Sequence, residues 1–229
     1  MKHGAGICII VVAAGTGSRY GADVPKQFVE LQGRPVVMVT IERLKSILPQ
    51  ADMILVISRE MAGLWNDLCA RHGFISPRVV WGGATRGESV GNAVSVLPDN
   101  ISVVGVHDGV RPVVSAGMVD TALAAIESGV DGAVPCVPVV QSLRRRTHDG
   151  WTPVDRSEYV AVQTPQFFRA SALCDAYRRL DPSGYTDDAS MLDAIGCGDV
   201  VMTPGDSHNI KITHPLDVEV AALYLGGLQ

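Results

Sequence analysis

The chain has 229 residues, of which 47% are hydrophobic, so it is long enough to bury a substantial core within one domain. Its formal net charge of -5 argues against non-specific nucleic-acid binding, which depends on lysine and arginine, and we expect no nucleic-acid partner. The apolar run Ile7–Val12 is too short to span a membrane, which takes about 20 residues, so we expect no membrane partner and a cytoplasmic location. A cleaved signal peptide is the alternative for this run.

Short apolar runs rich in β-branched residues alternate with segments of helical periodicity. The runs are Ile7–Val12, Met53–Ile57, Val79–Trp81, Val103–Val106 and Ala133–Val137. Apolar residues follow helical spacing at Met61–Cys69 and at Val90–Leu97. Ser115 could cap a helix that runs to about Ser128, and Pro215 fits the first position of a last helix. This alternation predicts a doubly wound, mostly parallel α/β sheet of the Rossmann-like kind, with residues 1–229 in a single domain.

One stretch, from residue 139 to about 160, interrupts the alternation. Two strand-like segments flank His148-Asp149-Gly150, and Asp-Gly is a strong signal for a hairpin turn. We call this predicted β-hairpin, residues 139–160, the arm. Its basic run Arg144–Arg146 is typical of a solvated surface. Because a two-stranded hairpin is marginally stable alone in water, pairing with its copy in a second subunit would bury it.

A glycine-rich segment follows the first predicted strand, which is the usual ligand edge of an open α/β sheet. It runs from Ala13 to Arg19, contains Gly15 and Gly17, and is followed by Pro25-Lys26-Gln27. Glycines let the backbone approach phosphate, and Arg19 and Lys26 add two cations. Tyr20 stands where a dinucleotide fingerprint needs its third glycine, and no Walker A motif is present. Gly-x-Gly alone is equally consistent with a plain tight turn.

Together with six further motifs in order, this segment resembles the opening of the sugar-phosphate cytidylyltransferase family. Within it, the chain is most similar to the 2-C-methyl-D-erythritol 4-phosphate cytidylyltransferases of the non-mevalonate isoprenoid pathway. The further motifs are Gly82-Gly83-Ala84-Thr85-Arg86-Gly87-Glu88-Ser89-Val90, Val106-His107-Asp108-Gly109-Val110-Arg111-Pro112, Val154-Asp155-Arg156, Gln163-Thr164-Pro165-Gln166-Phe167-Phe168, Thr186-Asp187-Asp188-Ala189-Ser190 and Asn209-Ile210-Lys211-Ile212-Thr213. The resemblance covers nearly the whole chain and implies a nucleotidyltransferase domain that works as a homodimer through the arm.

The resemblance also implies roles for individual residues. The residues it assigns to CTP are Ala13, Ala14, Gly15, Gly17, Lys26, Gly83, Arg86, Ser89 and Asp108. Those it assigns to the polyol phosphate acceptor are Asp108, Arg111, Ser142, Arg156 and Lys211. It implies Mg²⁺ or another divalent cation as cofactor, with Asp108 serving the metal directly or through water. The implied catalytic residues are Arg19, Lys26, Arg156 and Lys211.

Several of these residues have structural alternatives when each is judged alone. Thr85 or Ser89 could be a helix cap, and Asp108, at the end of an apolar strand, could be a turn or cap residue. Arg156 could be an ordinary surface charge. The same holds for Lys211, which we expect in a short strand, facing away from the isoleucines on either side.

The implied reaction transfers CMP from CTP to the acceptor and releases pyrophosphate. Its nucleophile is a phosphate oxygen that is already ionised near pH 7, because the second pKa of a phosphate monoester is about 6. No general base is required, which agrees with the lack of a Ser-His-Asp or Cys-His pattern in the sequence. The site must instead align two anions and offset the charge at the α-phosphorus.

Three departures from the family pattern concern the acceptor more than the nucleotide. Gln141 and Ser142 stand where the family often has Asp-Thr in the arm, and Ala84 stands where an acidic residue often lies near the base. Ribitol-5-phosphate cytidylyltransferase shares the motif set and is therefore the close alternative. A catalytically silent nucleotide-binding module is a further one, although the pair Arg19 and Lys26 disfavours it.

Overall fold

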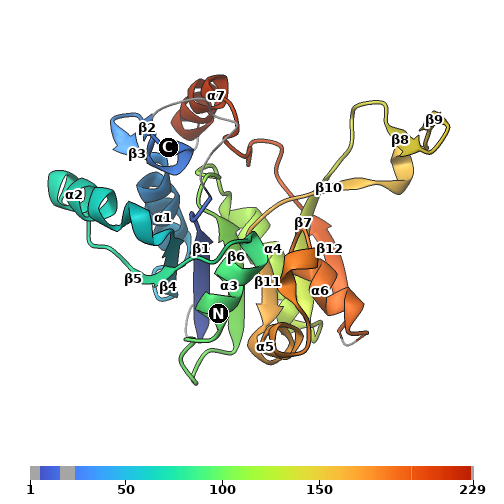
Figure 1. Ribbon diagram of the computed structural model, residues 1–229, viewed down its shortest axis with the longest axis horizontal. Coiled ribbons are helices and arrows are strands. Elements are labelled where there is room, and N and C mark those ends of the chain that lie inside the picture. Colours follow the sequence, from blue (N-terminus) through green and yellow to red (C-terminus); the bar gives the residue numbers. More distant parts are fainter. Residues whose placement is uncertain (1–5, 16–23, 197, 228–229) are drawn as a thin grey trace.

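The computed structural model describes residues 6–15, 24–196 and 198–227. Its centre is an eight-stranded sheet in the order β10-β7-β11-β6-β1-β4-β5, with β12 paired to β7 (Figure 1). The strands are β1 Ile7–Val12, β4 Asp52–Ile57, β5 Arg78–Trp81, β6 Val103–Asp108, β7 Gly132–Pro138, β10 Val160–Val162, β11 Gln166–Arg169 and β12 Val200–Pro204. Strands β6, β1, β4 and β5 are parallel, whereas β11 runs antiparallel between β6 and β7. The predicted α/β sheet with a parallel core is confirmed.

Helices cover both faces of the sheet, as a doubly wound fold requires. They are α1 Val36–Ile47, α2 Ala62–His72, α3 Arg86–Val94, α4 Ala116–Glu127, α5 Ala170–Arg179, α6 Ala189–Ala194 and α7 Pro215–Gly226. Apolar side chains of α1, α2 and α4 pack on one face, and those of α3, α5 and α6 on the other. Strand β1 serves both cores, because Ile9 and Val11 face the first and Cys8 and Ile10 the second. Within the described residues, no helix combines the length and the apolar character that a membrane crossing demands.

A third, smaller core joins α7, near the C-terminal end, to the segment around residues 31–36 and to the loop after β6. The short strands β2 Glu30–Leu31 and β3 Arg34–Pro35 form a hairpin, and Leu31 packs with Ile212 and with Ala221 of α7. Pro215 opens α7, as the sequence predicts, since proline is preorganised for the first helical turn. This core anchors the segment just before α7, which contains Lys211.

The predicted hairpin is present in the arm. Strands β8 Arg144–Thr147 and β9 Gly150–Pro153 pair antiparallel, and the Thr147–Gly150 pair closes the turn. Gly150 has a φ of +124°, a conformation that favours glycine. Figure 1 shows the hairpin projecting away from the sheet at the end of two extended connections. The β8-β9 hairpin therefore stands apart from the sheet, whereas the base of the arm pairs with it through Val160 and Pro138.

The strand predicted at Asn209–Thr213 is wrong. These residues join no sheet. The segment is held instead by isolated hydrogen bonds, such as the one from the Ile212 N–H to the Val110 carbonyl at 2.9 Å. Ile212 is buried and Lys211 is not, so the expected alternation of side chains survives without strand pairing. The prediction failed because a local pattern of apolar residues does not reveal whether a partner strand lies alongside.

Candidate active site

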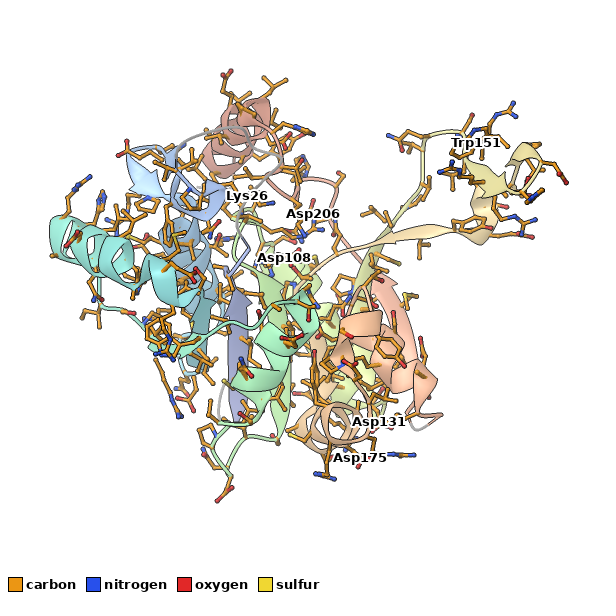
Figure 2. All side chains as sticks on the ribbon, viewed as in Figure 1. Lys26, Asp108, Asp131, Trp151, Asp175 and Asp206 are labelled. Atoms are coloured by element: carbon orange, nitrogen blue, oxygen red, sulfur yellow. The ribbon has the colours of Figure 1, made fainter. Side chains whose placement is uncertain are left out.

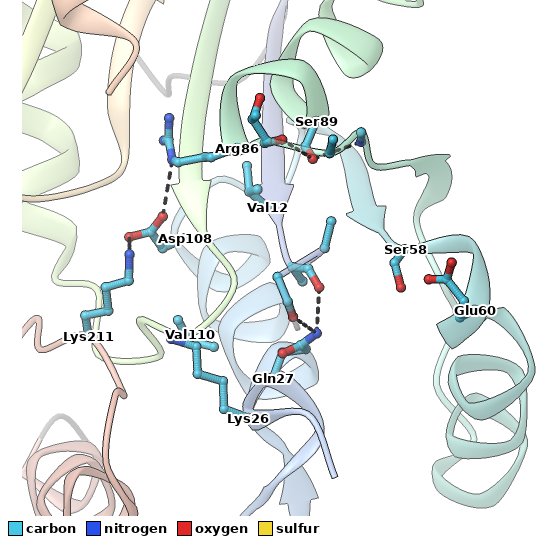
Figure 3. Close-up of a pocket in the computed structure, with 16 residues that line it drawn as sticks. Val12, Lys26, Gln27, Ser58, Glu60, Arg86, Ser89, Asp108, Val110 and Lys211 are labelled. Atoms are coloured by element: carbon cyan, nitrogen blue, oxygen red, sulfur yellow. Dashed lines mark hydrogen bonds and ion pairs between the residues drawn. The ribbon is translucent and has the colours of Figure 1, made fainter. Parts of the chain in front are cut away.

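A cavity of about 480 Å³ opens where β1, β4 and β6 end. Val12 and Asp108 are partners in the parallel ladder, so β1 and β6 end side by side and deliver their following loops to the same place. The lining residues are Val12, Ala13, Ala14, Gly15, Lys26, Gln27, Ser58, Glu60, Gly83, Ala84, Thr85, Arg86, Ser89, Asp108, Val110 and Lys211 (Figure 3). This is the carboxyl edge of the parallel strands, where open α/β sheets bind ligands.

Asp108 is the centre of a charged cluster on one wall of the cavity. Its Oδ2 atom lies 3.1 Å from Lys211 Nζ and 3.2 Å from Arg111 Nε, and its Oδ1 atom lies 3.9 Å from Arg86 Nε. Figure 3 shows the carboxylate between Arg86 and Lys211, which come from α3 and from the segment before α7. Sheet order thus brings two cations from distant parts of the chain, Arg86 and Lys211, to a strand-end carboxylate that also pairs with Arg111, three residues further along.

These cations determine the charge state of Asp108. Burial by itself would raise the pKa of Asp108, but Lys211, Arg86 and Arg111 outweigh burial and hold that pKa well below its ordinary value. Asp108 is therefore ionised at neutral pH. Asp188 pairs with Arg86 and adds a second carboxylate to the cluster. Two carboxylates then face three cations, so this wall keeps a net positive charge that suits an anionic ligand.

Behind Asp108, a hydrogen-bond chain fixes the strand end. The Thr164 hydroxyl accepts from the Asp108 N–H at 3.0 Å and donates to His107 Nδ1 at 3.1 Å. His107 Nε2–H then donates to the Arg111 carbonyl at 3.0 Å, which assigns the tautomer of the neutral ring. His107 is fully buried, and burial lowers its pKa to about 4. Its role is to support Asp108 rather than to bind a metal or transfer a proton.

We expect the buried His107 to make the protein acid-sensitive in a defined pH window. In the unfolded chain a histidine protonates near 6.5, whereas folded His107 protonates only near 4, so the unfolded state binds more protons between these values. The free energy of unfolding should fall by up to about 3 kcal/mol as the pH drops through this window. Urea unfolding at several pH values measures the slope. The His107→Gln variant should have a shallower slope there, and an unchanged slope would contradict the assignment.

The loop between β5 and α3 forms a second wall of the cavity, next to the cluster around Asp108. Thr85 is the N-cap of α3 and its hydroxyl accepts from the Glu88 N–H at 3.1 Å, so the capping alternative is correct for Thr85. Ser89 is buried, and its hydroxyl accepts from the Gly83 N–H at 3.1 Å and donates to the Thr85 carbonyl at 2.8 Å. The Ser89 side chain therefore holds the loop in place through these two hydrogen bonds and also lines the cavity.

Gly82 shows how closely this loop packs against the end of β1. A Cβ atom added at Gly82 would lie 2.4 Å from Ala14 Cβ and 3.0 Å from Ser89 Oγ. The Gly82→Ala variant should therefore displace the loop and raise KM for CTP by about tenfold or more. Steady-state kinetics test this, with Gly63→Ala on α2 as the control, because a Cβ there meets nothing within 4 Å. An unchanged KM for CTP would show that the loop is not part of the nucleotide site.

Lys26 reaches the cavity from a single 3-10 turn, Lys26–Phe28. Its neighbour Gln27 is buried and donates from Nε2 to the carbonyls of Ala13 at 2.8 Å and Gly15 at 3.0 Å. These bonds tie the turn to the end of β1 (Figure 3). The amide of Gln27 thus holds Lys26 and the start of the glycine-rich segment together.

Most of the residues that the sequence assigns to CTP line this one cavity. They are Ala13, Ala14, Gly15, Lys26, Gly83, Arg86, Ser89 and Asp108. Gly17 and Arg19 lie outside the described residues. Among the acceptor residues, Lys211 lines the cavity and Arg111 lies directly behind it, bound to Asp108 and to the Asn209 carbonyl at 2.8 Å.

Arg156 and Ser142 are not brought to this cavity in the same chain. Arg156 donates to the Val140 carbonyl at 2.5 Å and lines a separate cavity of about 670 Å³ at the base of the arm. Ser142 is exposed on the arm.

The structure adds residues to which the sequence analysis gave no role. Gln27 stands beside Lys26, and Asp188 stands in the quoted motif Thr186-Asp187-Asp188, so both carried a signal. Ser58 and Glu60 line the cavity after β4, and only their position behind a predicted strand could have indicated them.

A family model described as IspD, 2-C-methyl-D-erythritol 4-phosphate cytidylyltransferase, matches residues 7–227. The chain belongs to this family. It is 45% identical over 219 residues to the 2-C-methyl-D-erythritol 4-phosphate cytidylyltransferase of Porphyromonas gingivalis, covering 94% of this chain and 96% of the relative. Identity to the Bacteroides fragilis enzyme of the same name is 41% over 218 residues, covering 94% and 98% of the two chains.

The fold agrees with this membership. A crystal structure of the IspD cytidylyltransferase from Francisella tularensis superposes with a TM-score of 0.79 at 25% identity, covering 96% of this chain and 100% of the other. The predicted family, enzyme class and fold are therefore confirmed. Family membership also disfavours the alternative of a silent nucleotide-binding module, and it favours methylerythritol phosphate over ribitol phosphate as the acceptor.

Proposed function

We propose that the cavity transfers CMP from CTP to 2-C-methyl-D-erythritol 4-phosphate, giving 4-diphosphocytidyl-2-C-methyl-D-erythritol and pyrophosphate. The observation that carries the proposal is the cation cluster around Asp108, which faces the same cavity as the glycine-rich segment and the loop before α3. Two anionic substrates need a site with excess positive charge and close backbone, and this cavity offers both.

In this reaction an ionised phosphate oxygen of the acceptor attacks the α-phosphorus of CTP. The new P–O bond forms as the bond from the α-phosphorus to the oxygen bridging to the β-phosphate breaks, and pyrophosphate leaves. Catalysis then consists of alignment and charge stabilisation. We assign the stabilisation of charge on the triphosphate to Lys26, together with Arg19, which lies outside the described residues.

The acceptor phosphate would bind near Lys211, where the segment before α7 closes the cavity. Asp108 holds the Lys211 ammonium at 3.1 Å and leaves its other donors available to a phosphate. The base of CTP would lie against Gly83 and Ser89, on the wall formed by the loop before α3. In this arrangement the two walls would align the acceptor phosphate with the α-phosphorus of CTP.

Asp108 suits a divalent cation only in part. Both of its oxygens face cations, and no group of three or more His, Cys, Asp or Glu side chains in residues 6–15, 24–196 and 198–227 is arranged to hold a metal. We propose that Mg²⁺ would be carried mainly by triphosphate oxygens, with Asp108 contributing through a water molecule. When bound, the ion would reduce the negative charge of the triphosphate.

The assay that tests the proposed activity compares two acceptors. Purified enzyme is given CTP with methylerythritol phosphate or with ribitol 5-phosphate, and pyrophosphate release is measured. We expect turnover with methylerythritol phosphate at a kcat/KM far above that with ribitol 5-phosphate. Turnover with ribitol 5-phosphate alone would overturn the acceptor, and CTP binding without pyrophosphate release would overturn the activity.

We further propose that the arm joins two subunits and supplies Ser142 and Arg156 to the partner's cavity. Apolar side chains support an interface at the arm and the neighbouring sheet edge, because Val140, Trp151, Val160 and Met202 are 71%, 62%, 48% and 49% exposed. Such exposed apolar side chains in one region are typical of a protein interface.

Mixing two inactive variants tests the dimer and the exchange of arm residues together. Arg156→Ala damages the arm, and Lys211→Ala damages the cavity of its own chain. If arms are exchanged, a mixed dimer has one intact site, and an equal mixture should recover about a quarter of wild-type activity. If Arg156 serves its own chain, the mixture should recover none. Analytical ultracentrifugation of each variant provides the control for dimer formation.

A further inference from the structure

Arg86 lies between two carboxylates at the edge of the cavity. It is the first residue of α3, and its side chain is 27% exposed. Its Nη2 atom lies 2.8 Å from Asp188 Oδ2, whereas its Nε atom lies 3.9 Å from Asp108 Oδ1. The guanidinium is therefore held closely by Asp188 and only loosely by Asp108.

Asp188 is fully buried and uses both of its oxygens. Arg86 occupies Oδ2, and the Tyr177 hydroxyl donates to Oδ1 at 2.6 Å. Burial, and then the negative charge of Asp188, raise the pKa of Tyr177, so its hydroxyl stays protonated and remains a donor. A buried carboxylate is tolerated when it is paired and hydrogen-bonded, and this one has both a cation and a phenol.

The backbone fixes the place of Asp188 relative to Arg86. A Cβ added at Gly87, the next residue along α3, would lie 2.3 Å from the Pro182 carbonyl oxygen. The start of α3 thus lies directly on the 3-10 turn Pro182–Gly184, which precedes Asp188. Tyr177 comes from α5, so two further elements converge on the arginine at the cavity edge.

We propose that Asp188, oriented by Tyr177, is a positioning residue that holds the Arg86 guanidinium at the nucleotide side of the cavity and away from Asp108. Without Asp188, the closest carboxylate left to Arg86 is Asp108, which also pairs with Lys211. Arg86 would then compete with Lys211 for Asp108, and both walls of the cavity would be disturbed. The inference rests on the proposed function in that it takes CTP as the ligand next to Arg86.

The test is a double-mutant cycle with Arg86→Ala and Asp188→Ala, measured by kcat, by KM for CTP and by CTP binding in calorimetry. We expect Asp188→Ala to raise KM for CTP at least about tenfold, because it leaves a half-buried arginine without its partner. In the Arg86→Ala background the same change should cost less than about threefold, since Asp188 acts through Arg86. Full additivity of the two losses would overturn the proposal.

Two more variants distinguish a positioning role of Asp188 from a general effect on folding. Tyr177→Phe keeps the ring and removes the donor, so it should raise KM for CTP by about threefold, in the same direction as Asp188→Ala. Asp181→Asn changes an exposed carboxylate in the same segment, one that accepts from the Ser183 N–H, and should leave kcat and KM unchanged. A loss in Asp181→Asn equal to that in Asp188→Ala would also overturn the positioning role.

Failure of the proposed function would be recognised separately. In that case the wild-type enzyme itself would release no pyrophosphate. The cycle would then be read from CTP dissociation constants alone: coupling between Arg86 and Asp188 would support the positioning role, and additivity would overturn it.

Discussion

Replacing Lys26 by alanine should lower kcat by about a hundredfold and weaken CTP binding far less. Lys26 lines the cavity from a turn that Gln27 ties to the carbonyls of Ala13 and Gly15, so the backbone that carries it is held in place before substrate binds. A preorganised cation is most effective where negative charge develops, which is at the phosphoryl group in the transition state.

Single-turnover kinetics and CTP calorimetry separate the two effects of Lys26→Ala. Lys45→Ala is the matched control, because Lys45 is an exposed lysine in the last turn of α1 and does not line the cavity. It should leave both quantities unchanged. If Lys26→Ala weakens CTP binding as much as it lowers kcat, Lys26 merely holds the ground-state triphosphate.

The Asp108→Asn variant should lose at least about a hundredfold in kcat/KM and about 3 kcal/mol in the free energy of unfolding. The amide keeps the shape of the side chain but removes the charge that holds Lys211, Arg111 and Arg86 together. The three cations would then repel one another, and Lys211 would lose its fixed position.

Asp175→Asn is the matched control for this variant. Asp175 also pairs with two arginines, Arg178 at 3.0 Å and Arg179 at 3.2 Å, but on the exposed side of α5. Figure 2 shows it at the opposite end of the sheet from Asp108. Surface pairs contribute little, so urea unfolding should detect less than about 1 kcal/mol for this variant, with full activity. Wild-type turnover in Asp108→Asn would contradict the central place of the cluster.

Much of the fold was predictable because its signals are local. The apolar runs at β1, β4, β5, β6 and β7, the Asp149-Gly150 turn and Pro215 at the start of α7 each reflect backbone preferences of neighbouring residues. Strands β11 and β12 were missed and the strand at Asn209–Thr213 was wrong, since pairing depends on partners elsewhere in the chain.

The candidate site divides in the same way. The glycine-rich segment, the loop Gly82–Ser89 and Asp108 at a strand end were recognisable as motifs, and their order identified the family and the reaction class. Family membership does not decide how the departures at Gln141, Ser142 and Ala84 affect the choice of acceptor. The two-acceptor assay measures that choice directly.

The sequence by itself therefore determined the reaction class, because each motif is a short run of neighbouring residues and the order of the motifs along the chain is that of the family. Only the tertiary structure decided which charges meet. Arg86 pairs with a residue 102 positions away, and Arg111 bonds the carbonyl of a residue 98 positions away. Such contacts depend on the order of strands in the sheet. For the same reason only the folded chain shows that Arg156 lines a different cavity of the same chain and that Arg86 pairs with Asp188.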